Sequence, residues 1–281
     1  MTSNDSTPSK SFQIISSLRY DPALPSLLSQ NTPKTSTDHH TSPYYLLPYH
    51  QTRLLNAARH FQWDKATEFL SQDLSTLVQI FDTFLPDKTK PWRLRIVVDR
   101  TGTCNVEANA TTPIEPLNFL PFQAQAPSQV DGWRVYVDSV STVPSAFTTH
   151  KTTARDNYTA ARVRAGILSP QELAEVLVVN PEGHVMEGSI TTPYFRARPS
   201  QGQSVEDVDK DTGPEWITPP LSCGGNAGTT RQYALDQGLC TEHVITANEL
   251  VDGEECWLSN GVRGFVRGRV ILSYGDNTNH S

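Results

Sequence analysis

Four stretches in the first half of the chain have the alternation or the short apolar run of a β-strand. Residues 12–20 (FQIISSLRY) alternate enough to form one strand, and residues 93–99 (RLRIVVD) predict a stronger one. A glycine-bearing turn at 100–103 would return the chain antiparallel over residues 104–108. Residues 133–140 have the composition of a further strand.

Helical spacing occupies the region between these strands. Leu54, Ala58 and Phe61 fall on one face of a helix predicted over residues 52–61, which residues 46–53 lead into. Two further helices are predicted at 64–70 and 74–84, the second ended by Pro86, and Ser/Thr/Pro-rich or Pro-rich loops are predicted at 24–42 and 113–128.

The second half of the chain is richer in strands. An Asn-Pro-Glu-Gly turn at 180–183 predicts a hairpin between residues 175–179 and 184–187. A glycine-rich turn precedes a helix predicted over 229–237. The other expected elements are a helix at 155–165, strands at 192–196 and 255–259, and an exposed acidic insert at 198–215.

This pattern predicts two domains with frayed ends. A helix-bearing N-terminal α/β domain would occupy residues 11–143, and a strand-rich C-terminal domain would occupy 144–275. Residues 1–10 and 276–281 are expected to be disordered tails. A site between two domains is a natural place for a bound cofactor.

Charge and composition exclude several classes of function. The net charge of -7 argues against nucleic acid as a partner. No apolar run is long enough to span a membrane, and the polar N-terminus lacks the apolar core of a secretory signal, so we expect a cytoplasmic protein. The four cysteines form no Cys-x-x-Cys pair and the histidines have no metal-ligand spacing, so no metal site is expected.

Three segments carry candidate chemistry in a suggestive order. Lys151 offers an amine, Glu187 a carboxylate, and the run GGNAGTTR at 224–231 a helix start whose free N–H groups can bind an anion. A pyridoxal phosphate enzyme needs these three groups: a lysine for the Schiff base, an acid for the pyridine nitrogen and a phosphate cradle. Taken singly, each segment is better read as a surface lysine, a strand-end glutamate or a helix cap.

Together these segments resemble the fold-type-IV pyridoxal phosphate family, which contains branched-chain and D-amino acid aminotransferases and aminodeoxychorismate lyases. The resemblance runs from residue 12 onward and keeps the family's order of motifs. The matching runs are HQTRL at 50–54, HKTTARDNY at 150–158, VVNPEGHVMEGSITT at 178–192, TPPL at 218–221, GTTR at 228–231 and LSNGVRG at 258–264.

The resemblance implies an α/β fold of the two-domain α+β, D-amino acid aminotransferase-like type, with the cofactor in the cleft and usually a homodimer. Lys151 would be the Schiff-base lysine and Glu187 the partner of the pyridine nitrogen. The implied phosphate side comprises Arg53, Gly228, Thr229, Thr230, Ser259, Asn260 and Gly261. The candidates for binding substrate carboxylates are Arg19, Arg95, Arg155 and Arg263.

Three departures from the family pattern stand out. Thr192 lies where the family commonly has Asn, and Pro193 follows it. Tyr158 lies seven residues after Lys151, whereas the tyrosine of branched-chain aminotransferases that bonds the cofactor's phenolic oxygen lies five residues on. The insert at 198–215 also separates the EGSI and TPPL motifs by more than usual.

Within the family, the stretches FQIISSLRYDP, LLPYHQTRLLNAARHFQW and HKTTARDNYTAAR resemble the fungal aminodeoxychorismate lyases. The implied reaction acts on a small molecule, converting 4-amino-4-deoxychorismate to 4-aminobenzoate and pyruvate on the way to folate. Two alternatives stay open from the residues: a class-IV aminotransferase for a D-amino acid, a branched-chain amino acid or an amine, and a non-catalytic binding protein that keeps the fold.

Overall fold

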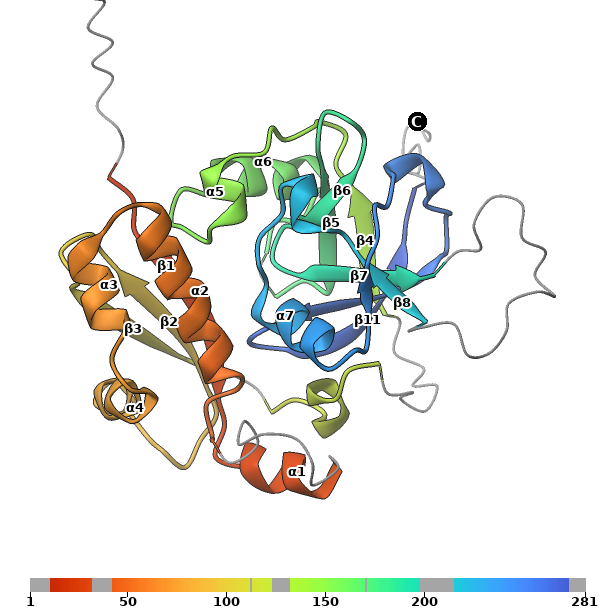
Figure 1. Cartoon of the computed structure of the whole chain (residues 1–281). Coiled ribbons are helices and arrows are strands. Elements are labelled where there is room, and N and C mark those ends of the chain that lie inside the picture. Colours follow the sequence, from red (N-terminus) through yellow and green to blue (C-terminus); the bar gives the residue numbers. More distant parts are fainter. Residues whose placement is uncertain are drawn as a thin grey trace, which may run out of the picture.

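The computed structural model describes residues 11–31, 42–111, 113–122, 132–169, 171–197 and 215–272. These residues form a mixed α/β architecture with two separate sheets, as the sequence predicted (Figure 1). The two expected tails, and all of the expected insert except Glu215, lie outside the described residues.

The small sheet has the antiparallel order β1 (Ile14–Tyr20), β2 (Trp92–Val98) and β3 (Cys104–Ala110). Leu18 of β1 lies opposite Leu94 of β2, and both are fully buried. This apolar face packs against three helices, which supply Leu54, Leu70 and Leu77 to the same core. Those helices are α2 (Leu47–His60), α3 (Asp64–Leu70) and α4 (Leu74–Asp82).

The large sheet has the order β6-β5-β4-β11-β10-β7-β8-β9. β4 runs parallel to both of its neighbours, and this mixed centre is flanked by antiparallel pairs. Its strands are β4 (Trp133–Val137), β5 (Ala174–Val179), β6 (Val185–Gly188), β7 (Thr192–Arg196), β8 (Trp216–Thr218), β9 (Thr241–Glu242), β10 (Glu255–Asn260) and β11 (Gly264–Val270). The accompanying helices are α5 (Ala146–Thr149), α6 (Asp156–Arg164) and α7 (Thr229–Asp236), with 3-10 turns η1 (Pro116–Phe119), η3 (Leu221–Cys223) and η4 (Ala247–Glu249).

The structure corrects the N-terminal loop prediction. Residues predicted as loop from position 24 begin with a helix, α1 (Leu24–Asn31). Leu24 and Leu28 lie one helical turn apart and are buried with Tyr45 and Phe119. The serines and the proline of this segment suggested a loop, but burial of the two leucines by distant aromatic rings selects the helix.

The start of α2 and the strand β11 also differ from expectation. α2 begins at Leu47 rather than at residue 52, because Pro48 at the first helical turn costs no hydrogen bond there. β11 was not predicted at all. It forms a hairpin with β10, the strand just before it, and pairs on its other side with β4, which lies far earlier in the sequence.

Two main-chain hydrogen bonds join β1 to the larger part of the molecule. The Ile15 N–H donates to the Lys151 carbonyl at 2.9 Å, and the Arg19 N–H donates to the Gly261 carbonyl at 2.9 Å. Helix α2 also packs against α7 across this junction (Figure 1). One strand of the small sheet therefore fixes two segments that the sequence marks as functional.

The division into two domains at residues 143 and 144 stays a prediction. β4 belongs to the large sheet through β5 and β11, although the predicted boundary assigns it to the N-terminal domain. The three strands of the small sheet all lie before residue 111.

Replacing Gly264 should destabilise the fold more than replacing another glycine of the same backbone conformation. Gly264 has φ +66°, and a Cβ there would lie 2.0 Å from the Asn118 carbonyl oxygen. Gly183 has φ +83° with nothing within 4 Å of its Cβ position. We expect Gly183→Ala to cost about 1 kcal/mol of unfolding free energy and Gly264→Ala more than about 2 kcal/mol. Equal urea-unfolding free energies for the two variants would show that the Asn118 contact yields freely.

Candidate active site

Lys151 lies at the junction between β1 and the part of the molecule built on the large sheet. It follows α5, whose start is closed by a capping box on Ser145. Its carbonyl accepts the Ile15 N–H, and the next residue, Thr152, forms a β-bridge with Ile14. The backbone of Lys151 is therefore held as an extension of the small sheet, while its side chain is half-buried.

The surroundings of Lys151 favour its neutral amine. Burial holds the pKa of Lys151 well below its ordinary value, and the positive charges of Arg155 and Arg53 lower it further. The carboxylate of Glu187 opposes this shift. A lysine with a lowered pKa serves as a nucleophile and as a general base near neutral pH.

Glu187 is held by two hydrogen-bond donors. It lies on β6 opposite Val178 of β5. The Tyr158 hydroxyl donates to Glu187 Oε1, and the backbone N–H of Asn226 also donates to the carboxylate. Burial nevertheless raises the pKa of Glu187. Such a fixed, partly desolvated carboxylate is suited to pair with a protonated ring nitrogen.

Tyr158 supports this carboxylate in the structure. Its hydroxyl is committed to Glu187 Oε1, its ring is buried, and the Arg155 guanidinium stacks 4.5 Å from the ring centroid. Burial and the neighbouring Glu187 raise the pKa of Tyr158, so the hydroxyl keeps its proton. The sequence left the role of Tyr158 open, and in the fold its hydroxyl orients the Glu187 carboxylate.

The N-terminus of α7 forms an anion cradle. Gly228 is its N-cap and has no side chain to close the first turn, so the first N–H groups are available to a ligand. Thr229 and Thr230 are buried, and Thr229 Oγ1 has no hydrogen-bond partner among the described residues. A Cβ on Gly228 would lie 2.6 Å from Thr192 Oγ1, so glycine is required for this close approach.

A second layer of hydroxyl groups supports the cradle. Thr230 Oγ1 lies 2.7 Å from Ser259 Oγ, which in turn lies 2.9 Å from the Tyr194 hydroxyl. Asn260 Oδ1 accepts the N–H groups of the next turn, from Val262 at 3.0 Å and Arg263 at 2.9 Å. Ser259 and Asn260 are thus engaged with the protein itself and shape the turn beside α7.

Arg53 projects from α2 and is partly buried. Burial lowers its pKa to about 10, and its Nε atom has no hydrogen-bond partner among the described residues. A buried guanidinium with an unused donor is costly unless an anion completes it. Its charge acts on Lys151, and the charge of Glu187 acts on Arg53, so these three predicted site residues are near one another.

The four predicted substrate arginines differ in their surroundings. The Arg19 side chain is fully buried and forms an ion pair with Asp21 at 2.8 Å, so it serves the fold. Arg95 is paired with Glu107 at 2.6 Å. Arg155 donates to the Ser189 carbonyl, and Arg263 stacks 4.7 Å from the Trp133 ring centroid. These contacts of Arg155 thus involve a carbonyl and an aromatic ring rather than a carboxylate.

Arg93 is a site residue that the sequence reading missed. Its positive charge lowers the pKa of both Lys151 and Arg263, and it has no ion pair with another described residue. Arg93 and Arg95 alternate with Leu94 on β2, so both point away from the apolar core. The sequence alone does not show which of the two is paired with a carboxylate. The register of β3 decides this, because it places Glu107 opposite Arg95 and Asn109 opposite Arg93.

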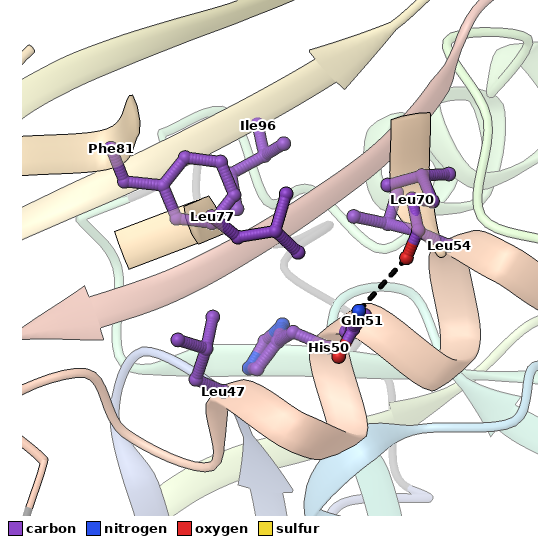
Figure 2. Close-up of a pocket in the computed structure, with 8 residues that line it drawn as sticks. All are labelled: Leu47, His50, Gln51, Leu54, Leu70, Leu77, Phe81 and Ile96. Atoms are coloured by element: carbon purple, nitrogen blue, oxygen red, sulfur yellow. Dashed lines mark hydrogen bonds between the residues drawn. The ribbon is translucent and has the colours of Figure 1, made fainter. Parts of the chain in front are cut away.

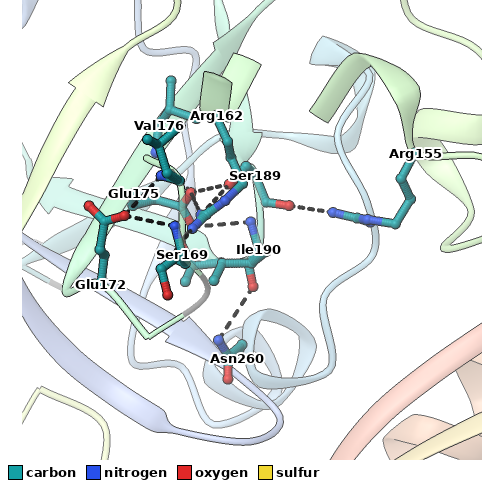
Figure 3. A network of polar contacts seen from close by, with 11 residues as sticks. Arg155, Arg162, Ser169, Glu172, Glu175, Val176, Ser189, Ile190 and Asn260 are labelled. Carbon is teal, nitrogen blue, oxygen red and sulfur yellow. Dashed lines mark hydrogen bonds and ion pairs between the residues drawn. The ribbon is translucent and has the colours of Figure 1, made fainter. Parts of the chain in front are cut away.

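A buried carboxylate organises the turn that follows Glu187. Glu175 of β5 is fully buried and accepts the Ser189 hydroxyl, the Thr191 hydroxyl at 2.7 Å and the Ile190 N–H at 3.1 Å (Figure 3). Arg162 donates to Ser189 Oγ at 3.1 Å, which closes the network. The sequence showed Glu175 only as a strand residue, because its partners lie 14 to 16 residues further on.

Figure 2 shows a pocket in the core of the small domain, separate from Lys151, Glu187 and Thr229. Its lining is mostly apolar, and the amide of Gln51 donates to the Leu70 carbonyl at 2.8 Å. The lining residues are Leu47, His50, Gln51, Leu54, Leu70, Leu77, Phe81 and Ile96. We assign it to the packing of the fold.

The described residues contain no group of three or more His, Cys, Asp or Glu side chains arranged to hold a metal ion. All four cysteines are free thiols. In the part of the chain that the structure describes, no helix is both long and apolar enough to cross a membrane.

The pKa of Lys151 should respond in opposite directions to two substitutions. Arg155→Gln removes a positive charge that lowers this pKa, so the pKa should rise. Glu187→Gln removes a negative charge that raises it, so the pKa should fall further. Competitive labelling of the apo-protein with acetic anhydride across pH, read by mass spectrometry of the Lys151 peptide, measures both shifts. Labelling of exposed Lys65 in the same samples should be identical in all variants, and shifts of the same sign would contradict the assignment.

A half-buried lysine with a lowered pKa, a fixed carboxylate and an anion cradle at a helix start define the class of a pyridoxal phosphate enzyme. The chain belongs to the amino-transferase class IV family, whose sequence pattern residues 36–271 match. Enzymes of this family depend on pyridoxal phosphate, so the expected family and cofactor are confirmed.

Relatives and solved structures agree with this assignment. The chain is 32% identical to the aminodeoxychorismate lyase of Saccharomyces cerevisiae over 207 residues, which are 65% of this chain and 52% of that protein. The match thus spans about half the length of the yeast protein.

Two solved structures share the fold. The branched-chain amino acid aminotransferase from Escherichia coli superposes with a TM-score of 0.58 at 14% identity, covering 94% of this chain and 77% of its own. The 4-amino-4-deoxychorismate lyase from Pseudomonas aeruginosa gives 0.55 at 16% identity, covering 92% and 83%. The predicted fold class is therefore confirmed.

The residues present fit the family's cofactor. Two buried polar atoms without partners, Thr229 Oγ1 and Arg53 Nε, lie on the two elements that flank the phosphate cradle, α7 and α2. Such atoms are stabilised when an anion supplies the missing acceptor. Lys151 and Glu187 provide the amine and the acid at the other end of the site.

Proposed function

We propose that this protein is a pyridoxal phosphate-dependent lyase that converts 4-amino-4-deoxychorismate to 4-aminobenzoate and pyruvate. The likeness to the yeast lyase supports this particular reaction over others of the family. The single structural observation that carries the proposal is the partly neutral Lys151 amine facing Glu187 amid several arginines. The substrate needs a base at one carbon and cations for its two carboxylates.

The cofactor would be held at three points. The N–H groups and hydroxyls of Thr229 and Thr230, together with Gly228 and Arg53, would bind its phosphate, and the Ser259–Gly261 turn would support them. Glu187, oriented by Tyr158, would pair with its ring nitrogen. When bound, the cofactor supplies an electron sink for the pair left on the amine-bearing carbon.

Lys151 would move the proton. Its neutral amine would take the proton from the amine-bearing carbon of the substrate. The bond to the enolpyruvyl oxygen then breaks as the ring becomes aromatic. The Lys151 ammonium would return the proton to the methylene carbon of the departing group, which leaves as pyruvate. The buried surroundings of Lys151 disfavour its charged form and so favour the neutral amine that takes the proton.

Arg93 is our best candidate for binding a substrate carboxylate, because its charge reaches Lys151 and no carboxylate of the described protein pairs with it. Arg93→Gln should raise KM for aminodeoxychorismate about 10- to 100-fold through the loss of a charge-assisted hydrogen bond, with cofactor affinity unchanged. Arg95→Gln is the matched control, since Glu107 already pairs with Arg95. Steady-state kinetics decide the matter, and a larger effect at Arg95 would overturn the choice.

The reaction itself is tested by product analysis. Holoenzyme supplied with aminodeoxychorismate should release 4-aminobenzoate and pyruvate in equal amounts. The main alternative is a class IV aminotransferase, which shares the site up to proton removal and then returns the proton to the cofactor carbon. No 4-aminobenzoate, together with transfer of the amino group from a D-amino acid, a branched-chain amino acid or an amine to an acceptor keto acid, would replace the lyase by that alternative.

We also propose a homodimer, which the resemblance to the family supports, and a cytoplasmic location. Light scattering of the purified protein at micromolar concentration should give about twice the 31.2 kDa mass of the chain. A monomer that retains full activity would contradict the dimer.

A further inference from the structure

Arg53 belongs to a chain of three hydrogen-bonded side chains. Its Nη2 donates to Ser16 Oγ at 2.6 Å, and Ser16 Oγ lies 2.7 Å from His50 Nδ1. Since the guanidinium has only donors, Ser16 accepts from Arg53. We assign the Ser16 O–H as the donor to His50 Nδ1, because His50 Nδ1 is the acceptor within reach of this hydroxyl among the described residues. The chain therefore has one direction: Arg53 to Ser16 to His50.

This direction requires a neutral histidine with a free Nδ1 lone pair. Burial holds the pKa of His50 well below its ordinary value, and the charges of Arg53 and Lys151 lower it further. Nδ1 is thus the acceptor, and Nε2 carries the proton. Ser16 and His50 are both fully buried, so water does not compete for these bonds.

The other ring nitrogen of His50, Nε2, lacks a hydrogen bond among the described residues. The imidazole edge abuts the turn after β10, because a Cβ on Gly261 would lie 2.5 Å from His50 Cε1. An apolar side chain would fill this place without an unpaired donor, so the structure gives His50 one polar task, the bond to Ser16.

The strand that carries Ser16 also holds the lysine segment. Ile15, the neighbour of Ser16, donates its N–H to the Lys151 carbonyl. β1 therefore fixes the main chain at the amine end of the site and, through Ser16, the guanidinium at the phosphate end. A one-residue change in the β1 register would disturb both.

We propose that Ser16 and His50 are positioning residues that hold the Arg53 guanidinium in the phosphate cradle. This inference rests on the cradle proposed above. The bond to Ser16 engages one terminal nitrogen of Arg53 and fixes the rotamer of a long side chain, so less conformational entropy is lost when the phosphate binds.

The test compares binding of pyridoxal phosphate with binding of pyridoxal, which lacks the phosphate, to the apo-enzyme. Ser16→Ala and His50→Leu should each weaken pyridoxal phosphate about 10-fold and leave pyridoxal unchanged. His50→Asn should recover most of the affinity, because its Oδ1 can stand in for Nδ1 as the acceptor. Ser17→Ala, on the opposite face of β1, is the matched control and should change neither affinity.

Three results would overturn the positioning role of Ser16 and His50. Unchanged pyridoxal phosphate affinity in Ser16→Ala and His50→Leu overturns the inference. Equal weakening of both ligands, or no recovery in His50→Asn, also overturns it, since a general structural role would then account for the loss. Arg53→Gln separates the two levels of the argument: if it leaves pyridoxal phosphate affinity unchanged, the cradle itself is wrong. If only Arg53→Gln weakens binding, the cradle stands and the positioning chain fails.

Discussion

Lys151→Ala should abolish turnover, lowering kcat by about 10⁴-fold or more, because one side chain supplies both the covalent attachment and the proton transfer. The variant should fold normally, since the structural bond at this position runs from the Ile15 N–H to the main-chain carbonyl of Lys151. Steady-state release of 4-aminobenzoate, with thermal unfolding measured in parallel, checks both parts.

The matched control for this substitution is Lys65→Ala. Lys65 is an exposed lysine on α3 that pairs with Glu68 at 3.2 Å. An exposed pair of this kind contributes little, so activity and stability should both remain. A Lys151→Ala protein that keeps more than about a tenth of wild-type kcat would exceed what the loss of a catalytic base allows, and the role of Lys151 would be wrong.

Glu187→Gln should retain the cofactor but lose about 10²- to 10³-fold in kcat, comparable to the loss of one strong electrostatic contact at a reacting group. Glutamine keeps the shape of the side chain and can still accept from Tyr158, but it does not stabilise a protonated ring nitrogen. The electron sink is then weaker. Measurement of kcat together with the dissociation constant of the cofactor separates chemistry from binding.

Two companion variants test this reading of Glu187. Tyr158→Phe removes only the orienting hydroxyl and should cost about 10-fold in kcat, the scale of one lost hydrogen bond. Glu182→Gln changes an exposed glutamate in the turn before β6 and should have no effect. Full activity in Glu187→Gln would remove the ring-nitrogen role from this carboxylate.

Local signals predicted much of the fold. β1, β2 and the β5–β6 hairpin follow from alternation and turn residues that lie within ten positions of each other, and α3 begins and ends at the predicted residues. α1 and β11 could not be found in this way. The leucines of α1 are buried by Tyr45 and Phe119, which are distant in sequence. β11 has the local partner β10, but its place in the sheet also depends on β4, which lies far earlier in the chain.

The site shows the same division between local and distant information. Lys151, Glu187 and the Gly228–Thr230 cradle could be named from their motifs, because the chemistry of each is local. The substrate arginines could not be ranked, since Arg19 and Arg95 are neutralised by Asp21 and Glu107 only after folding.

The roles of the residues that support the site could not be predicted from the sequence for a related reason. Glu175 meets the Ser189–Thr191 turn across a strand pair, and Ser16 meets His50 across 34 positions of the chain. His50 opens the HQTRL run and Ser189–Thr191 lie in the EGSITT run, but the sequence does not indicate that Ser16 meets the first or Glu175 the second. Their contribution arises from the sheet register and the packing of α2 on β1.

The central claim is that Lys151 is the residue that attaches the cofactor in this class IV enzyme. Borohydride reduction of the holoenzyme, followed by digestion and mass spectrometry of the peptides, tests it directly. Our account predicts one pyridoxyl group per chain, on the peptide that contains Lys151, and none in Lys151→Ala. A pyridoxyl group on any other lysine, or an active holoenzyme that borohydride leaves unmodified, would contradict the account.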